Sequence, residues 1–238
     1  MDPRQGLTRG RTRVRSIEGI LESQPWDALV PHLLKAGVNP DEATGRLREY
    51  AKLLLEWNRN ISNLVSKHDE ERIVERHVAE AVEPAGLLKS CGAKRWLDFG
   101  SGGGFPGIPL ALLGVGERWS LVESRRMKTL FLRKAVETLQ LAGVEVRQAR
   151  LETLEAEPEL RGAFDGFTSR ATMALGPTLV LAAHFVSPGG SAFLWKGSRR
   201  EDEMTQNREW DQLWAHEGLL GIGNGQTVVA RFIRKAAE

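Results

Sequence analysis

The run from residue 96 to residue 107 constrains the fold more than any other part of the chain. Trp96–Phe99 is a short apolar stretch typical of a buried strand, and four of the five residues after it are glycine. Because glycine has no Cβ, such a loop can turn tightly and lets a ligand approach the main chain. In open α/β sheets, ligands bind just beyond the carboxyl ends of the strands. The run therefore predicts an α/β fold that binds a ligand on this loop.

Further strands and helices alternate along the chain after the glycine loop. Apolar runs predict strands at 119–123, 144–149, 164–169, 192–195 and 228–233. We expect helices between them, with Pro106 in the first turn of one, Ser124 capping another that ends near Leu141, and a third over 174–186. Strands that alternate with helices form βαβ units, so the pattern predicts a doubly wound, mostly parallel sheet.

The part of the chain before the glycine loop shows helical rather than alternating periodicity. Apolar residues recur at intervals of three and four over Leu47, Tyr50, Leu54 and Trp57, which predicts a helix that begins near Pro40. A second helix is expected from Asp69 to Leu88. These elements predict an N-terminal helical extension over residues 17–90, followed by a ligand-binding domain over residues 91–238.

The first fifteen residues are rich in arginine. They hold five arginines, at positions 4, 9, 11, 13 and 15, against a single aspartate. Because the segment has too little apolar surface to order itself, we expect a disordered basic arm over residues 1–16. Two interpretations stay open: an arm that contacts nucleic-acid phosphates, or a solvated tail without a specific role.

The composition is that of a globular protein without disulfides or membrane segments. Of the 238 residues, 41% are hydrophobic and 27% are charged, which favours a packed core over disorder. Cys91 is the only cysteine, so no internal disulfide can form. No run reaches the roughly 18–20 apolar residues that span a bilayer, no signal peptide is evident, and the histidines lack metal-ligand spacing. We expect a cytoplasmic monomer with no membrane or metal partner.

Two kinds of cofactor compete for the glycine loop. Gly102, Gly104 and Gly107 match the G-x-G-x-x-G pattern of dinucleotide-binding loops, in which a helix N-terminus holds a pyrophosphate. Asp98 argues against that interpretation, because a carboxylate two residues before the first glycine would repel a pyrophosphate. It suits a cationic ligand instead. S-adenosylmethionine carries a sulfonium and an ammonium group and no phosphate, so the loop favours this cofactor.

Glu123 supports a nucleoside cofactor in either case. It ends the second predicted strand, where an acidic residue binds ribose hydroxyls in doubly wound folds. An ionised carboxylate is acceptor-only, so it can accept hydrogen bonds from both hydroxyls. The alternative is an exposed glutamate that caps the next helix.

The run from Asp98 to Leu110, DFGSGGGFPGIPL, closely resembles the cofactor loop of the RsmG (GidB) family of small-subunit (16S) ribosomal RNA guanine-N7 methyltransferases. Other family blocks agree in order and spacing: Leu55–Asn58, Arg76-His77, Lys128–Leu132, Ser169–Ala171 and Trp195–Gly197. The resemblance covers about residues 33–235. It implies the Rossmann-like class I methyltransferase fold, S-adenosylmethionine as cofactor, and small-subunit ribosomal RNA or the ribosomal subunit as partner.

The resemblance also implies individual cofactor contacts. The family's contact positions fall on Gly100, Phe105, Leu151, Glu152 and Arg170. The alternative for Glu152 is an acidic residue at a helix start.

Two departures from the family pattern concern RNA contacts more than the cofactor. Glu80-Ala81 stands where the family usually has Asp-Ser, and Gln226-Thr227 replaces an Arg-His pair before the last strand.

The implied reaction needs no general base, because guanine N7 has a lone pair and no proton at neutral pH. Catalysis can then come from alignment, which contributes up to roughly 7–11 kcal/mol. Arg170 and Lys196 are the substrate-side candidates, although Lys196 could also be a solvated lysine at a strand end. Phe105 is the candidate for a functional aromatic residue. Further cations could contact RNA or form a solvated face: Arg125, Arg126, Lys128, Arg133, Lys134, Arg199 and Arg200.

Three other functions stay open: a methyltransferase with a non-RNA substrate, a nucleotide-binding oxidoreductase, and an RNA-binding protein without catalytic activity.

Overall fold

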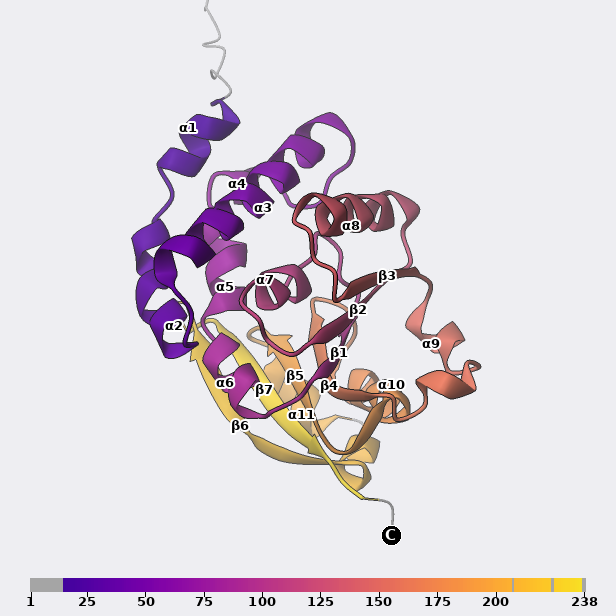
Figure 1. Ribbon diagram of the computed structural model, residues 1–238. Coiled ribbons are helices and arrows are strands. Elements are labelled where there is room, and N and C mark those ends of the chain that lie inside the picture. Colours follow the sequence, from indigo (N-terminus) through magenta and orange to yellow (C-terminus); the bar gives the residue numbers. More distant parts are fainter. Residues whose placement is uncertain (1–14, 207, 224, 237–238) are drawn as a thin grey trace, which may run out of the picture.

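A seven-stranded sheet forms the centre of the computed structural model, which describes residues 15–206, 208–223 and 225–236. The strands are β1 (Arg95–Phe99), β2 (Arg118–Glu123), β3 (Val144–Gln148), β4 (Phe164–Arg170), β5 (Val186–Lys196), β6 (Trp214–Ile222) and β7 (Thr227–Arg234). Their order across the sheet is β3-β2-β1-β4-β5-β7-β6. β1 to β5 are parallel, whereas β7 runs antiparallel between β5 and β6. The predicted doubly wound, mostly parallel sheet is confirmed (Figure 1).

Helices cover both faces of this sheet. The helices after β1 are α7 (Gly107–Leu112), α8 (Arg126–Thr138), α9 (Leu151–Leu154), α10 (Leu175–Phe185) and α11 (Arg200–Thr205). The helices before it are α1 (Ile17–Glu22), α2 (Val30–Lys35), α3 (Pro40–Asn60), α4 (Lys67–Glu70), α5 (Ala79–Val82) and α6 (Ala85–Ser90). The chain also forms 3-10 turns at Trp26–Leu29, Pro158–Leu160 and Arg208–Gln212, and a π-helical turn at Val74–Val78. None of the described helices is long and apolar enough to cross a membrane.

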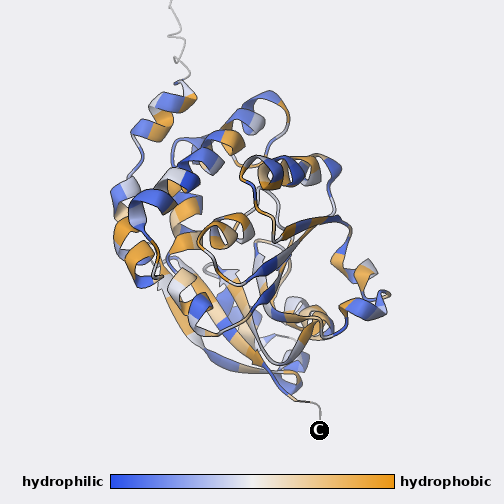
Figure 2. Ribbon diagram, in the orientation of Figure 1, coloured by the Kyte–Doolittle hydropathy of each residue, from blue (hydrophilic) through white to orange (hydrophobic). Residues whose placement is uncertain are grey.

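The sheet has a hydrophobic core on each face, and successive residues of a strand point into different cores. On β1, Trp96 belongs to the core under α3, α7 and α8, whereas Leu97 belongs to the core under α9 and α10. This is the two-residue period of a strand that is buried on both faces. Along α3 and α8 hydrophobic and hydrophilic residues alternate (Figure 2), as expected for helices with one buried side.

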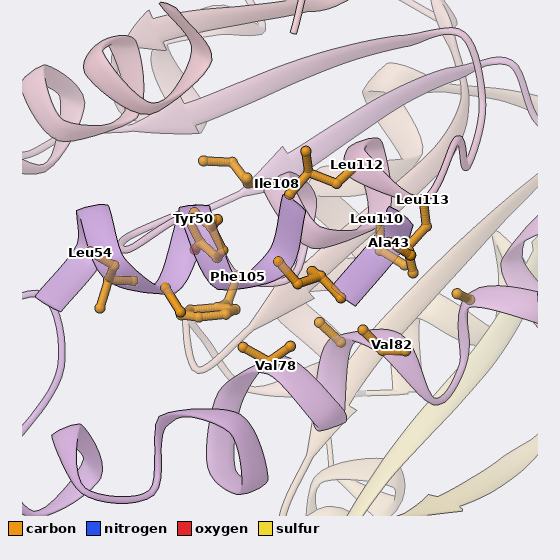
Figure 3. Close-up of a cluster of buried hydrophobic side chains, with 14 of the residues drawn as sticks. Ala43, Tyr50, Leu54, Val78, Val82, Phe105, Ile108, Leu110, Leu112 and Leu113 are labelled. Atoms are coloured by element: carbon orange, nitrogen blue, oxygen red, sulfur yellow. The ribbon is translucent and has the colours of Figure 1, made fainter. Parts of the chain in front are cut away.

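The N-terminal helices share the first of these cores with the sheet domain. Tyr50 and Leu54 of α3 and Val78 of the π-helical turn pack against Phe105 and Ile108 beside the glycine loop (Figure 3). The helical extension predicted over 17–90 ends with α6 at Ser90, but it does not have a hydrophobic core of its own.

Several local predictions were wrong. The helix expected over 69–88 is interrupted after Glu70, contains the π-helical turn, and breaks again at Pro84. Ser124 does not cap α8: Arg125 occupies the cap position, and no side chain caps the helix. The edge strand β6 was not predicted, because its exposed, glycine-containing sequence lacks an apolar run.

The prediction of a disordered basic arm over residues 1–16 was wrong at Arg15 and Ser16. Residues 1–14 lie outside the described residues. Arg15 already forms an ion pair of 2.9 Å with Glu71, and the Ser16 hydroxyl accepts a hydrogen bond from the Gly19 amide to cap α1.

Candidate cofactor site at the glycine loop

The glycine loop has the backbone conformation that its sequence predicts. Gly100, Gly102 and Gly104 have φ values of +69°, +54° and +93°, in the left-handed region that favours glycine. A Cβ at Gly100 would lie only 2.4 Å from Thr172 Cγ2. Gly100 therefore cannot be replaced by a larger residue without displacing the Thr172 side chain.

Residues of the N-terminal helices hold the glycine loop in place. The Tyr50 hydroxyl of α3 is buried and donates a hydrogen bond of 2.5 Å to the Gly103 carbonyl. The Phe105 ring packs edge-on against Tyr50 and stacks on His77, with ring centroids 5.3 and 5.1 Å apart. Only 7% of Phe105 is exposed, and the residue belongs to the hydrophobic core.

Asp98 lies behind the loop rather than on its open side. Its carboxylate is fully buried: Oδ1 accepts a hydrogen bond of 2.7 Å from Thr168, and Oδ2 lies against Gly107. Burial raises the pKa of Asp98 to about 6, and the Thr168 hydrogen bond limits the increase. The prediction that this carboxylate faces the ligand is not supported, because the start of α7 at Gly107 covers it.

Glu123 connects β2 to the glycine loop. Its Oε2 accepts a hydrogen bond of 3.0 Å from the Gly102 amide, and its Oε1 accepts one of 2.8 Å from the Arg125 amide. The alternative of an exposed helix-capping glutamate was wrong about exposure, since Glu123 is only 7% exposed, although its bond to the Arg125 amide does lie at the start of α8. The carboxylate is thus held in one orientation at the carboxyl end of its strand.

A cavity of about 320 Å³, here called the loop cavity, opens at this point. Its wall contains four of the predicted cofactor contacts, namely Gly100, Glu123, Leu151 and Glu152. Arg125 and Lys128 add positive charge, and Ala171–Met173 closes one side. The other predicted contacts are not part of this wall: Asp98, Gly102, Gly104, Phe105 and Arg170.

Arg170 is bound to the N-terminal helices. Its Nη2 forms an ion pair of 2.9 Å with Glu80 and donates a hydrogen bond of 2.9 Å to the Arg76 carbonyl. The same group lies 2.9 Å from His77 Nδ1. Burial, followed by the neighbouring Arg170 charge, lowers the pKa of His77 to about 3, so the imidazole is neutral and its Nδ1 accepts from Arg170. The structure therefore places Arg170 in a buried polar cluster.

Lys196 is also held by neighbouring residues. Its Nζ donates a hydrogen bond of 2.8 Å to the Met173 carbonyl and forms an ion pair of 2.8 Å with Glu203. Its side chain is 11% exposed, so the alternative of a solvated lysine was wrong.

Sequence reasoning did not identify the wall formed by Ala171, Thr172 and Met173, and it noted Ala171 only as the end of the family block Ser169–Ala171. Ala171 has a φ of +54°, which is uncommon for a residue with a Cβ. The Thr172 hydroxyl lies 2.6 Å from the Ser169 hydroxyl, which fixes the turn after β4. Alanine, threonine and methionine do not by themselves suggest a binding site. Only the position of these residues after a parallel strand could have indicated that they line a cavity.

Within the described residues, no group of three or more His, Cys, Asp or Glu side chains is arranged to hold a metal ion.

Comparison with known proteins agrees with this architecture. Residues 44–217 match the family model described as GidB, rRNA small subunit methyltransferase G. The ribosomal RNA small subunit methyltransferase G of Sorangium cellulosum (strain So ce56) is 36% identical over 184 residues, which cover 76% of each chain. Its counterpart in Rhodospirillum centenum is 39% identical over 168 residues, covering 71% of this chain and 74% of that protein.

Solved structures show the same fold at low sequence identity. A putative O-methyltransferase from Klebsiella pneumoniae is 17% identical with a TM-score of 0.58, covering 80% of this chain and 90% of that chain. The O-methyltransferase from Bacillus cereus, solved in complex with SAH, is 18% identical with a TM-score of 0.57, covering 80% and 91%. The family match and the identities to the curated relatives together show that this chain belongs to the rRNA small subunit methyltransferase G family.

Proposed function

We propose that this protein transfers the methyl group of S-adenosylmethionine to N7 of a guanine in small-subunit (16S) ribosomal RNA. The observation that carries the proposal is the position of Glu123, which lines the loop cavity and is bonded to the glycine loop, in a chain of this methyltransferase family.

The residues of the loop cavity fit a nucleoside. Each Glu123 oxygen accepts one backbone hydrogen bond and keeps a lone pair for a ribose hydroxyl. The backbone of Leu151 and Glu152, beside the end of β3, would then lie along the adenine. Gly100 forms part of the same wall, and the cations Arg125 and Lys128 suit the carboxylate of the methionine part.

The same geometry disfavours a dinucleotide. A pyrophosphate needs free amides at a helix N-terminus. Here the Gly102 amide donates to Glu123, and the buried Asp98 carboxylate lies beneath Gly107 at the start of α7. At neutral pH, above the pKa of about 6, that carboxylate is ionised and repels a phosphate. A nicotinamide dinucleotide is therefore the weaker candidate.

S-adenosylmethionine, when bound, supplies a methyl group on a cationic sulfur. Guanine N7 attacks with its own lone pair, and the wall of the loop cavity contains no histidine that could act as a base. The chain's contribution is to hold the two reactants in line, which reduces the barrier through orientation. Ala171–Met173 lies beside the loop cavity that would hold the cofactor, and hydrogen bonds with Ser169 and Lys196 keep this segment in place.

Exposed cations near the cavity support an RNA substrate. Arg125 and Arg126 at the start of α8 are exposed, as is Arg199 before α11. Lysine and arginine side chains in such positions neutralise phosphates and release counterions.

Two measurements test the proposal. Calorimetry should detect binding of S-adenosylhomocysteine and no binding of NAD. Radiolabelled S-adenosylmethionine should transfer label to small-subunit RNA or particles from a strain that lacks the protein, and mass spectrometry of nucleosides should identify 7-methylguanosine. NAD binding without S-adenosylhomocysteine binding would establish an oxidoreductase instead. Cofactor binding without label in RNA would point to another substrate.

The proposal includes a monomeric enzyme that acts in the cytoplasm without a metal ion. Light scattering of the purified protein and activity in the presence of a chelator test the first and last of these points.

A further inference from the structure

A second cavity, of about 480 Å³, lies on the other side of the Ala171–Met173 wall. It is lined by Trp195–Gly197 at the end of β5, by Arg199, and by residues of α11. Because Ala171, Thr172 and Met173 line both cavities, two ligands bound in them would approach each other across this short segment. A cavity of this size is ample for a nucleobase.

Two of the four charged side chains of the second cavity bind each other, and the other two do not. Lys196 and Glu203 bind each other, and Glu203 also accepts a hydrogen bond of 2.8 Å from the Leu175 amide at the start of α10. By contrast, the side chains of Arg199 and Asp202 are exposed and have no hydrogen-bond or ion-pair partner among the described residues. Arg199 and Asp202 are therefore free to bind a ligand.

We propose that Asp202 recognises the target guanine through its Watson–Crick edge, an inference that rests on the proposed function. Guanine presents two adjacent donors there, N1–H and the 2-amino group, and an ionised carboxylate offers two acceptor oxygens. The corresponding edges of adenine and cytosine each place an acceptor nitrogen beside the amino donor, and that of uracil flanks one donor with two acceptors. A free carboxylate in the second cavity thus selects guanine over the other three bases.

This orientation directs the reacting atom toward the cofactor. N7 belongs to the imidazole side of guanine, on the far side of the ring from N1 and the 2-amino group. If Asp202 on α11 holds the Watson–Crick edge, the imidazole side faces away from α11. Ala171–Met173 forms the wall shared with the loop cavity, so N7 points toward the cavity that would hold the cofactor. Arg199 then lies at the mouth as a partner for a flanking phosphate.

The test combines one protein variant with one altered base. The methylated guanine is first located in small-subunit RNA, and the RNA is then assembled by ligation with inosine at that position, which lacks only the 2-amino group. For the unaltered protein, inosine should lower kcat/KM roughly tenfold, since it removes one hydrogen bond to a charged group. Asp202→Ala should lower kcat/KM on guanine by roughly 10- to 100-fold and methylate guanine and inosine RNA at equal rates.

Controls separate this inference from the proposed function and from misfolding. Asp202→Ala should bind S-adenosylhomocysteine with unchanged affinity, because Asp202 is not in the wall of the loop cavity. Glu201→Ala, which alters a neighbouring side chain that is 85% exposed and outside the second cavity, should keep the full discrimination against inosine. If the unaltered protein methylates guanine and inosine equally well, or if Asp202→Ala keeps the tenfold discrimination, the role of Asp202 is wrong. If no RNA is methylated, the proposed function itself fails.

Discussion

Glu123 is the residue on which cofactor binding depends most. It joins the end of β2 to the Gly102 amide, and its remaining lone pairs line the loop cavity. We expect Glu123→Ala to weaken S-adenosylhomocysteine binding roughly 10- to 100-fold, because hydrogen bonds to a charged group are lost. Calorimetry measures the change, with Glu117→Ala as control, since that carboxylate is exposed and lies before β2. Equal affinities in both variants would remove the ribose assignment.

The raised pKa of Asp98 makes the stability of the folded protein depend on pH. Its pKa is about 6 in the folded protein against an ordinary value of 3.8. Between these values the folded state binds more protons than the unfolded state, so the contribution of Asp98 to stability falls as the pH rises from about 4 to 6. Asp98→Asn removes this loss.

The measurement for Asp98 is a comparison of urea unfolding at pH 4 and pH 7. From the lower to the higher pH, the free energy of unfolding of Asp98→Asn should rise relative to the unaltered protein by roughly 2–3 kcal/mol. Taking the difference cancels other titrating groups such as His77. A difference that does not change with pH would show that the Asp98 pKa is not raised.

At the scale of elements, the Lys196–Glu203 pair fixes the segment between the two cavities. It ties the end of β5 to the Met173 carbonyl and to the start of α10. We therefore expect Lys196 to act by positioning this segment rather than by binding phosphate. Lys196→Gln should lower kcat for RNA methylation about tenfold, and Lys196→Arg should restore part of the loss.

Salt dependence separates this role of Lys196 from RNA binding. If Lys196 binds no phosphate, Lys196→Gln leaves the slope of log Kd against log salt for RNA unchanged. Arg199→Gln, at an exposed cation of the same cavity, should reduce that slope by about 1. A reduced slope in Lys196→Gln would show that the lysine contacts RNA after all.

At the scale of the whole molecule, the sequence predicts features that depend on a local pattern. The buried parallel strands are apolar runs, and the spacing of Glu123 from the glycine loop follows from the βαβ unit. β6 was missed because much of it is exposed and its glycine-containing sequence lacks an apolar run. The burial of Asp98 could not be predicted either, because it depends on how α7 packs over the loop. Likewise, the left-handed conformation of Ala171 is imposed by its tertiary surroundings.

The N-terminal helices and the sheet are joined by a buried ion pair, and this junction should make them unfold together. Glu80 lies between Arg170 of β4, at 2.9 Å, and Arg76, at 3.2 Å. Burial raises the pKa of Glu80 and lowers that of Arg170, with each charge opposing the other's shift. Removing one partner leaves the other charge buried without compensation, so Glu80→Met should destabilise the protein by about 3–5 kcal/mol. Glu117→Met, which breaks the exposed pair with Lys94, should change stability by less than about 1 kcal/mol.

The double variant Glu80→Met with Arg170→Met tests the pairing directly. With both charges gone, its loss of stability should be smaller than the sum of the two single losses, because no uncompensated charge remains. Urea unfolding followed by circular dichroism supplies the free energies of unfolding of the unaltered protein and of the three variants, and each should show one transition, since the helices and the sheet share a core. Additive losses would mean that the two side chains do not interact, and two transitions would mean that the helices before residue 91 fold independently of the sheet.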